Sequence, residues 1–426
     1  MSQTAQNAPP EEIPLEDVDL TDHARFAERV PHEMFLTLRR EDPVHWQEEA
    51  NGSGFWAVTK HADITHVHKE WETFSSERGG TSLQDLKPDE IEARKSMIDM
   101  DPPRHNQLRA IVNRDFTSKA VRVFEERIRD LIRGILDDAI EKEEIDFVAD
   151  VSAELPMRVF AEMLGAPRED HHLLVEIGDK MLGQDDPEYA IDPEVEKANR
   201  HLPFSNPAAL EMFEYGRRLA EERRKAPRED IVTKLIEAEI DGQHLTQQEY
   251  DVYFLLLAVA GNETTRHSIT HGVLAMLEHP DQLERLRNPD DEHERLFHHA
   301  AGEILRWATP VHHFRRTATR DTELGGKEIK EDDKVVTWFI SGNFDDDVFE
   351  DPYRFDVGRH PNRQMTFGPG GPHFCTGAHL ARLEVQIVFE ELVDRVGEIE
   401  LTGPVERLQS NFFNGIKRMP ARISAR

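Results

Sequence analysis

The only cysteine of this 426-residue chain, Cys375, lies in a segment that cannot form regular structure and leads directly into a helix. Three glycines and two prolines in Gly368–Pro372 exclude a helix or strand there. Beyond Gly377, helical spacing follows at Leu380, Leu383, Ile387 and Val388. Amide groups at the start of a helix stabilise a thiolate, so Cys375 is a candidate nucleophile or metal ligand. The alternative is a buried cysteine that acts only as a small apolar residue.

A second helix is predicted through the middle of the chain. Thr246 and Glu249 form a capping-box pattern, and apolar residues continue from there to a stop at Pro280. About 30 residues at 1.5 Å each would span ~45 Å. The helix contains the segment AGNETT, in which Glu263 and Thr264 could relay protons. The alternative is a close helix contact at Gly261, with Glu263 in an ion pair.

Composition limits the class of protein. The formal net charge of −32 disfavours nucleic acid and anionic membranes as partners. One cysteine excludes an intramolecular disulfide and fits a reducing cytoplasm. The polar N-terminus lacks the pattern of a signal peptide, and no apolar run reaches the ~20 residues of a membrane span. A cytoplasmic protein without a membrane anchor is therefore expected.

The expected architecture is mainly helical with small sheets. Residues 1–22 are predicted to form a flexible tail, and residues 23–426 a single domain. A hairpin is predicted within Val44–Ile64, and a long mobile loop with one short helix over Ser75–Asp99. Further strands are predicted at Glu323–Ile329, at Val335–Phe339 and from Ile399 onward.

Other clusters of polar residues carry weaker signals. The histidine pairs at 171–172, 298–299 and 312–313 lack the spacing of a zinc site and are interpreted as solvated surface. The run Asp345–Asp347 lacks an EF-hand pattern and is interpreted as an exposed turn.

Five segments, taken in order, resemble the cytochrome P450 family over nearly the whole chain. They are MDPPRHNQLR (100–109), AGNETT (260–265), Glu303-Ile304-Leu305-Arg306, DPYRFDVGR (351–359) and the loop that ends HFCTG (373–377). A lone ExxR occurs often by chance, but the ordered set with the cysteine loop is specific. The resemblance implies the P450 fold, with haem b between the central helix and the helix after Cys375.

The resemblance also implies residue roles. Cys375 would ligate the iron, and Glu263 and Thr264 would manage protons at bound dioxygen. The expected haem contacts are Ala260, Gly261, Phe367 and Gly377, and the expected propionate ligands are His105, Arg109, Arg316 and His373. Arg315 adjoins Arg316, so the assignment could shift by one. Glu303, Arg306 and Arg359 would form a structural ion-pair triad. Many members have Phe seven residues before the cysteine, where this chain has Gly368, and Phe367 is preferred as the residue that shields the sulfur.

The implied activity is hydroxylation of an apolar terpenoid, steroid or lipid-like substrate with O2. The chain has neither a dinucleotide motif nor a four-cysteine ferredoxin pattern. Electrons are therefore expected from a separate ferredoxin and its NAD(P)H-dependent reductase, which would dock on Arg104, Arg114 and Arg382. A monomer is expected. The predicted substrate pocket comprises Leu256, Val259, Ala260, Val311, Phe412 and Phe413, with part of the loop 79–100. The alternatives are a peroxide-using haem enzyme and a haem sensor without enzymatic activity.

Overall fold

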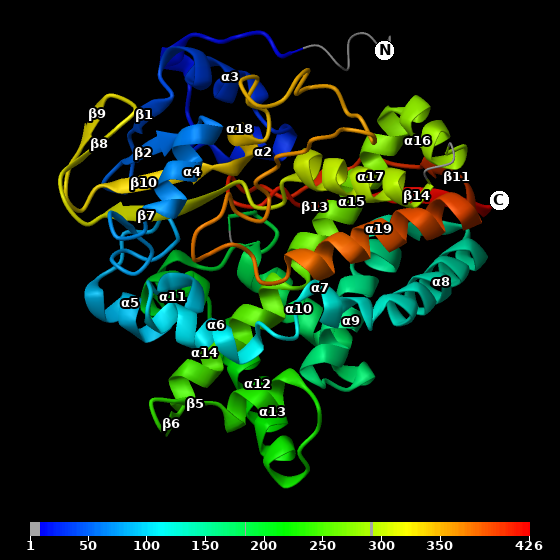
Figure 1. The fold of residues 1–426 in the computed structure, drawn as a ribbon, viewed down its shortest axis with the longest axis horizontal. Helices are drawn as coiled ribbons and strands as arrows, with labels where there is room; N and C mark the ends of the chain where they lie inside the picture. Colours follow the sequence, from blue (N-terminus) through cyan, green and yellow to red (C-terminus); the bar gives the residue numbers. More distant parts are fainter. Residues whose placement is uncertain (1–8, 184, 290–292) are drawn as a thin grey trace.

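A computed structural model describes residues 9–183, 185–289 and 293–426, in which helices form the larger part and the largest sheet lies toward one side (Figure 1). The first half contains the helices α2 His23–Glu28, α3 His32–Glu41, α4 His61–Lys69, α5 Pro88–Arg94, α6 Arg104–Val112, α7 Ser118–Arg122, α8 Glu125–Lys142, α9 Glu154–Leu164, α10 His171–Leu182 and α11 Pro193–Ala198. The second half contains α12 Ala208–Lys225, α13 Ile231–Glu237, α14 Gln247–Ala260, α15 Glu263–Glu278, α16 Pro280–Arg287, α17 His293–Ala308, α18 Phe339–Gly342 and α19 Ala378–Arg395. The expected fold class, mainly α with small β-sheets, is confirmed.

The largest sheet has five strands in the order β1 (Val44–Gln47), β2 (Phe55–Val58), β10 (Lys334–Trp338), β7 (His313–Ala318) and β3 (Phe74–Ser75). The predicted hairpin is confirmed as the antiparallel pair β1–β2, in which Val44 is opposite Val58. Strands β10 and β2 are parallel, so the hairpin joins segments almost 280 residues apart in sequence. This sheet places β7 and its arginines beside the helical part of the molecule.

Four smaller sheets are present among the described residues. They comprise β11 (Val396–Leu401) with β14 (Pro420–Ala425) and β4 (Glu144–Asp146), β12 (Glu406–Arg407) with β13 (Ile416–Arg418), β5 (Glu239–Ile240) with β6 (Gln243–His244), and β8 (Thr322–Leu324) with β9 (Lys327–Ile329). The strands predicted near 323–329, 335–339 and beyond 399 are therefore present.

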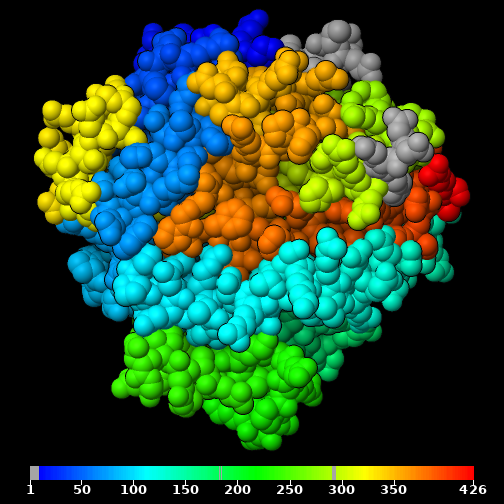
Figure 2. All heavy atoms as spheres, viewed as in Figure 1, coloured from blue at the N-terminus to red at the C-terminus, as the bar shows by residue number. Residues whose placement is uncertain are grey.

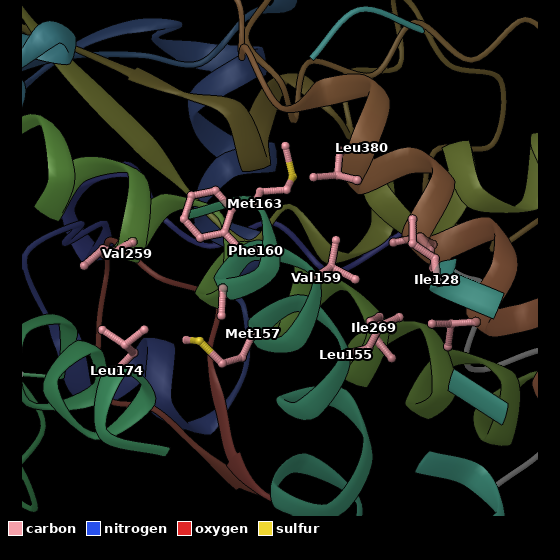
Figure 3. Close-up of a cluster of buried hydrophobic side chains, with 14 of the residues drawn as sticks. Ile128, Leu155, Met157, Val159, Phe160, Met163, Leu174, Val259, Ile269 and Leu380 are labelled. Carbon is pink, nitrogen blue, oxygen red and sulfur yellow. The ribbon is translucent and has the colours of Figure 1, made fainter. Parts of the chain in front are cut away.

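The helical core surrounds α15. Helix α15 packs on α17 and α19, and α19 packs on α8, with which it lies side by side (Figure 1). One continuous apolar cluster joins these helices, and Figure 3 labels members from distant segments, including Phe160 of α9, Val259 of α14 and Leu380 of α19. No described helix has the length and apolar character that crossing a membrane requires.

The central helix differs from the prediction. The capping box is present, because the Thr246 side chain accepts from the Glu249 amide and the Glu249 side chain accepts from the Thr246 amide. The helix is not continuous to Pro280, however, but is interrupted at Gly261 and Asn262 between α14 and α15. A side chain at Gly261 would meet the ring of Phe160 at 2.6 Å, so the break is a point of close packing.

Residues 9–22, which were expected to belong to a flexible tail, pack against the rest of the protein. Leu20 is fully buried and belongs with Val18 to the apolar cluster that α3 and the large sheet share. The Ile13 amide donates to Thr37 Oγ1 of α3 at 3.1 Å. Sparse apolar residues in a polar segment were enough to fix residues 9–22 against the fold. The first eight residues of the expected tail lie outside the described residues.

Candidate active site

A large internal cavity of about 970 Å³ joins residues that the sequence analysis assigned to one site. The predicted cofactor and pocket residues on its wall are His105, Arg109, Leu256, Val259, Ala260, Gly261, Thr264, Val311, Arg316, Phe367, His373, Cys375, Gly377, Phe412 and Phe413. Five elements far apart in sequence therefore converge here. Glu263 and the predicted triad do not line this cavity.

Cys375 lies at the start of α19, as predicted. Its amide donates to the Phe367 carbonyl at 2.8 Å, which closes the loop, and Gly377 caps the helix. Cys375 is exposed toward the cavity, where the surrounding protein limits the contact of the thiol with water. This burial raises the pKa of the Cys375 thiol, against the amides of Gly377 and Ala378 and the charge of Arg109. The helix start alone therefore does not produce a thiolate, and a metal ion would have to hold it.

Phe367, the residue expected to shield the sulfur, lines the same cavity as Cys375. It is largely buried, and the Arg382 guanidinium lies over its ring at 5.5 Å. Gly368 takes a φ of +85°, which few side chains tolerate, so the residue seven positions before the cysteine forms a turn. The aromatic residue is therefore displaced by one position.

Two arginines and three histidines line the cavity beside Cys375. The rings of His105 and His373 are 4.3 Å apart, and Arg109 Nη1 donates to the Pro372 carbonyl at 3.2 Å. Arg316 Nη2 lies 3.4 Å from Nδ1 of His68. Burial lowers the pKa of Arg316 to about 10 and that of His373 to about 2. We call His68, His105, Arg109, Arg316 and His373 the cation cluster after its two arginines, because burial lowers the pKa of each of the three histidines and favours their neutral form.

The cation cluster lacks an anionic partner. Within the described ranges, neither Arg109 nor Arg316 forms an ion pair, and the buried Nε2 of His373 has no hydrogen-bond partner. Unpaired buried cations are costly, so a group that brings carboxylates to them would be stabilised. A thiol and a cluster of cations on one cavity therefore fit an iron porphyrin with propionate side chains.

Two details of the cation cluster go beyond the sequence analysis. Arg316 and not Arg315 lines the cavity, whereas Arg315 turns to the carbonyls of Ser82 and Gln84. His68 was not predicted, because it lies on α4 outside the recognised motifs. Its ring bonds Thr337 Oγ1 at 3.0 Å, next to Arg316. No sequence signal distinguishes His68 from His66 of the same helix.

Thr264 and Glu263 face different surroundings. Thr264 lines the large cavity, and its hydroxyl donates to the Ala260 carbonyl at 3.0 Å. Glu263 lines a separate small cavity with Asp179, Tyr189 and Lys417, and it forms an ion pair with Arg266. Burial raises the pKa of Glu263 to about 8, although the Arg266 charge opposes the shift. The acid and the alcohol therefore do not line one proton path directly, and the ion-pair alternative for Glu263 is present.

The predicted triad is a buried ion-pair network away from the cavity. Arg306 donates to both carboxylate oxygens of Glu303 at 2.8 Å, and Arg359 Nε donates to the same carboxylate at 3.1 Å. Arg306 also donates to the carbonyls of Asn343 and Pro352. These contacts join α17 to the segment before the cysteine loop, which is a structural arrangement.

The prediction of solvated histidine pairs was wrong for His312 and His313. Both are buried, His312 Nδ1 lies 3.0 Å from the Asn411 carbonyl, and the His313 ring lies 4.5 Å from the ring of Trp338. Burial lowers the pKa of each to about 3, so both are neutral. The alternation of β7 turns His313 inward, which residue type alone does not reveal. His171 is also buried.

The predicted exposed turn at Asp345–Asp347 is only partly exposed. Asp345 is buried, accepts from the His61 amide at 2.8 Å and pairs with Lys60. Asp346 and Asp347 are exposed. The buried carboxylate therefore anchors the start of α4.

The family model for cytochrome P450 matches residues 23–397 of this chain. The chain is 40% identical over 412 residues to a steroid C26-monooxygenase of Mycolicibacterium smegmatis, which covers 94% of this chain and 92% of the relative. It is 38% identical to a methyl-branched lipid omega-hydroxylase of Mycobacterium tuberculosis, over 97% of this chain and 96% of that protein. A Mycobacterium marinum cytochrome P450 in complex with pseudoionone superposes with a TM-score of 0.87 at 36% identity, over 97% of this chain and 100% of that chain.

The chain belongs to the cytochrome P450 family. It is a bacterial P450 monooxygenase, an oxidoreductase that acts on an apolar substrate, and haem with its iron is a feature of this family.

Proposed function

We propose that this P450 binds haem b through Cys375 and hydroxylates a terpenoid, steroid or lipid-like substrate. The observation that carries the proposal is the single cavity that holds Cys375, Thr264, the cation cluster and an apolar wall. Relatives named as steroid and methyl-branched lipid hydroxylases support the substrate class. The bound haem supplies the activation of dioxygen, and the chain supplies binding, orientation and proton control.

The polypeptide has three tasks in this proposal. The cation cluster orients the haem propionates, with Arg109 and Arg316 as the permanent charges. Leu256, Val259 and Ala260 of α14, with Val311, Phe412 and Phe413, exclude water and hold the apolar substrate. The Thr264 hydroxyl, held by Ala260, keeps a proton donor at the cavity wall.

Glu263 acts on the proton supply from the second cavity. Phe413 lines both cavities, so a thin wall separates the Glu263 side from the Thr264 side. Burial raises the pKa of the Glu263 carboxyl against the opposing charge of Arg266, which brings its titration closer to neutral pH. We assign Glu263 a supporting role, in which it supplies protons to the Thr264 side across the break between α14 and α15.

Electrons come from a separate ferredoxin with an NAD(P)H-dependent reductase. The orange segment that includes the cysteine loop and α19 reaches the surface above a cyan band of helices (Figure 2). Arg114 is exposed, and Arg382 lies over Phe367 beside Cys375. The charge of Arg104 is offset by an ion pair with Glu249. The proposed docking patch therefore centres on Arg114 and Arg382. In this proposal the protein is a monomer and acts in the cytoplasm.

The proposed activity is tested by reconstitution. Purified holoprotein is combined with a ferredoxin, its reductase and NAD(P)H, and products from steroid and branched-lipid panels are identified by mass spectrometry. NAD(P)H- and O2-dependent hydroxylation supports the proposal. Turnover with hydrogen peroxide alone would favour the peroxide-using alternative, and dioxygen binding without turnover would favour a sensor.

A further inference from the structure

Arg94, the last residue of α5, lies on the wall of the large cavity in a segment separate from the cation cluster. Its guanidinium contacts only neutral acceptors. Nη2 donates to Ser82 Oγ at 3.0 Å, and Nη1 makes longer contacts of 3.3 to 3.5 Å to Gln84 Oε1, Ser205 Oγ and the Leu202 carbonyl. Nε makes no hydrogen bond to any described residue. The guanidinium fork is therefore incompletely satisfied.

The acidic residues around Arg94 are all bound elsewhere. Asp99 accepts from Thr81 and from Ser96 through both its oxygens. Glu90 pairs with Arg200. Glu196 accepts from the Gln84 side chain and so reaches Arg94 only through that amide. Among the described residues, no carboxylate lies within ion-pair distance of Arg94.

Each of the other arginines on the cavity wall already has an assigned partner or role. Arg109 and Arg316 belong to the cation cluster, and Arg200 has Glu90 as its partner. Nearby cations outside the cavity wall are also paired, since Lys334 contacts Glu49 and Asp85. Arg94 is the remaining cation. Burial lowers the pKa of its guanidinium, against the charges of Asp99 and Glu90.

The surroundings of Arg94 define the chemistry of its partner. Apolar side chains of Leu86, Ile91, Met97, Ile98 and Phe204 share the same cavity wall. A guanidinium fork matches the two oxygens of a carboxylate, and a charge-assisted pair is strongest where water is excluded. The ligand would thus be apolar over most of its length and anionic at one end.

We propose that Arg94 binds the carboxylate of an acidic substrate, such as a branched fatty acid or a steroid carboxylic acid, and so selects acids over neutral lipids. This inference rests on the proposed function and names the substrate class of the same cavity. With its carboxylate held at Arg94, the apolar part of the ligand occupies the rest of the cavity, whose wall includes Cys375, so oxidation takes place on the apolar part and not beside the carboxylate.

The test compares acids with their own methyl esters on the holoprotein. Substrate-induced shifts of the Soret band give Kd for phytanic acid and for cholanic acid, each beside its methyl ester. The wild type is expected to bind at least one acid roughly 10- to 100-fold more tightly than its ester. Arg94→Gln should abolish this preference by weakening the acid alone, and Arg94→Lys should restore part of it. Which acid shows the preference separates fatty acids from steroid acids.

A structural role of Arg94 would give a different result. Arg94 also links the 82–84 segment to the 202–205 segment, and loss of that link would weaken acid and ester equally. Equal weakening, no acid preference in the wild type, or loss of the preference in Arg200→Gln but not in Arg94→Gln would each overturn the inference. Continued hydroxylation of the neutral esters in those cases would leave the monooxygenase function intact.

Discussion

The Thr264 hydroxyl donates to the Ala260 carbonyl at 3.0 Å, across the break that separates α14 from α15. This bond occupies a carbonyl that helix continuation would otherwise use, and it holds the hydroxyl at the cavity wall. The Thr264 side chain therefore has two roles: it stabilises the helix break and it takes part in proton transfer at the cavity.

Thr264→Ala should lower product formed per O2 consumed by about ten-fold or more, because a positioned proton donor contributes on the order of 10²–10⁴. Consumption of NAD(P)H should continue, with hydrogen peroxide released in place of product. Oxygen uptake, peroxide and product are measured in the same reaction. Thr264→Ser, which keeps the hydroxyl, is the matched control, and equal coupling in the alanine variant would refute the role.

Arg316→Gln should weaken retention of haem, since it removes a buried cation that has no carboxylate partner in the described protein. Loss of one charge-assisted contact corresponds to a roughly 10- to 100-fold faster transfer of haem to an apoprotein acceptor. Arg320→Gln is the control on the same side of the molecule, because Arg320 is exposed and bonds only Thr73 Oγ1 among the described residues. Equal transfer rates in the two variants would contradict the propionate assignment.

Glu303→Gln should lower the free energy of unfolding by about 3–5 kcal/mol, because it leaves the buried charge of Arg306 without its partner. Denaturant unfolding of the holoprotein measures the loss. The exposed pair Arg285–Asp356 provides a comparison, and Arg285→Gln should cost only about 0.2–1 kcal/mol. A loss of similar size in both variants would mean that the triad is not a structural centre.

The buried Glu384 carboxyl should make the free energy of unfolding depend on pH. This residue of α19 is buried, and burial raises the pKa of its carboxyl from 4.5 to about 8. Between these values the folded protein holds a proton that the unfolded chain has released, so stability falls as pH rises through this window. Glu384→Gln should remove that slope, which is about 1.4 kcal/mol per pH unit for one proton.

Unfolding of the holoprotein between about pH 5 and 8 measures this slope. Glu391→Gln on the same helix is the control, since Arg133 and Arg129 hold the pKa of Glu391 below its usual value despite burial. The contribution of Glu391 to stability is already complete above the ordinary carboxyl pKa of 4.5, and so throughout this pH range, and the slope of the control should therefore equal that of the wild type. An unchanged slope in Glu384→Gln would show that this carboxyl does not bind the extra proton.

The sequence predicted the features that depend on local pattern. The helix after Cys375, the capping box at Thr246 and the hairpin at Val44 all follow from spacing and turn residues, and the structure contains each. The motifs, together with the predicted pocket residues, identified fifteen residues that line one cavity, because family resemblance carries information on distant contacts.

The features that the sequence did not reveal depend on packing between distant segments. Glu263 lines the small cavity beyond the break at Gly261, where Phe160 of α9 packs closely against the chain. The burial of His313 depends on Trp338 of the neighbouring strand, and the role of His68 depends on Arg316, almost 250 residues away. No local pattern contains these relationships.

The most direct test of the central claim is the carbon monoxide difference spectrum of the dithionite-reduced holoprotein. The account predicts the long-wavelength Soret band of thiolate ligation, and Cys375→His should lose that band while the protein stays folded. A short-wavelength, histidine-like band in freshly prepared native protein would contradict Cys375 as the iron ligand.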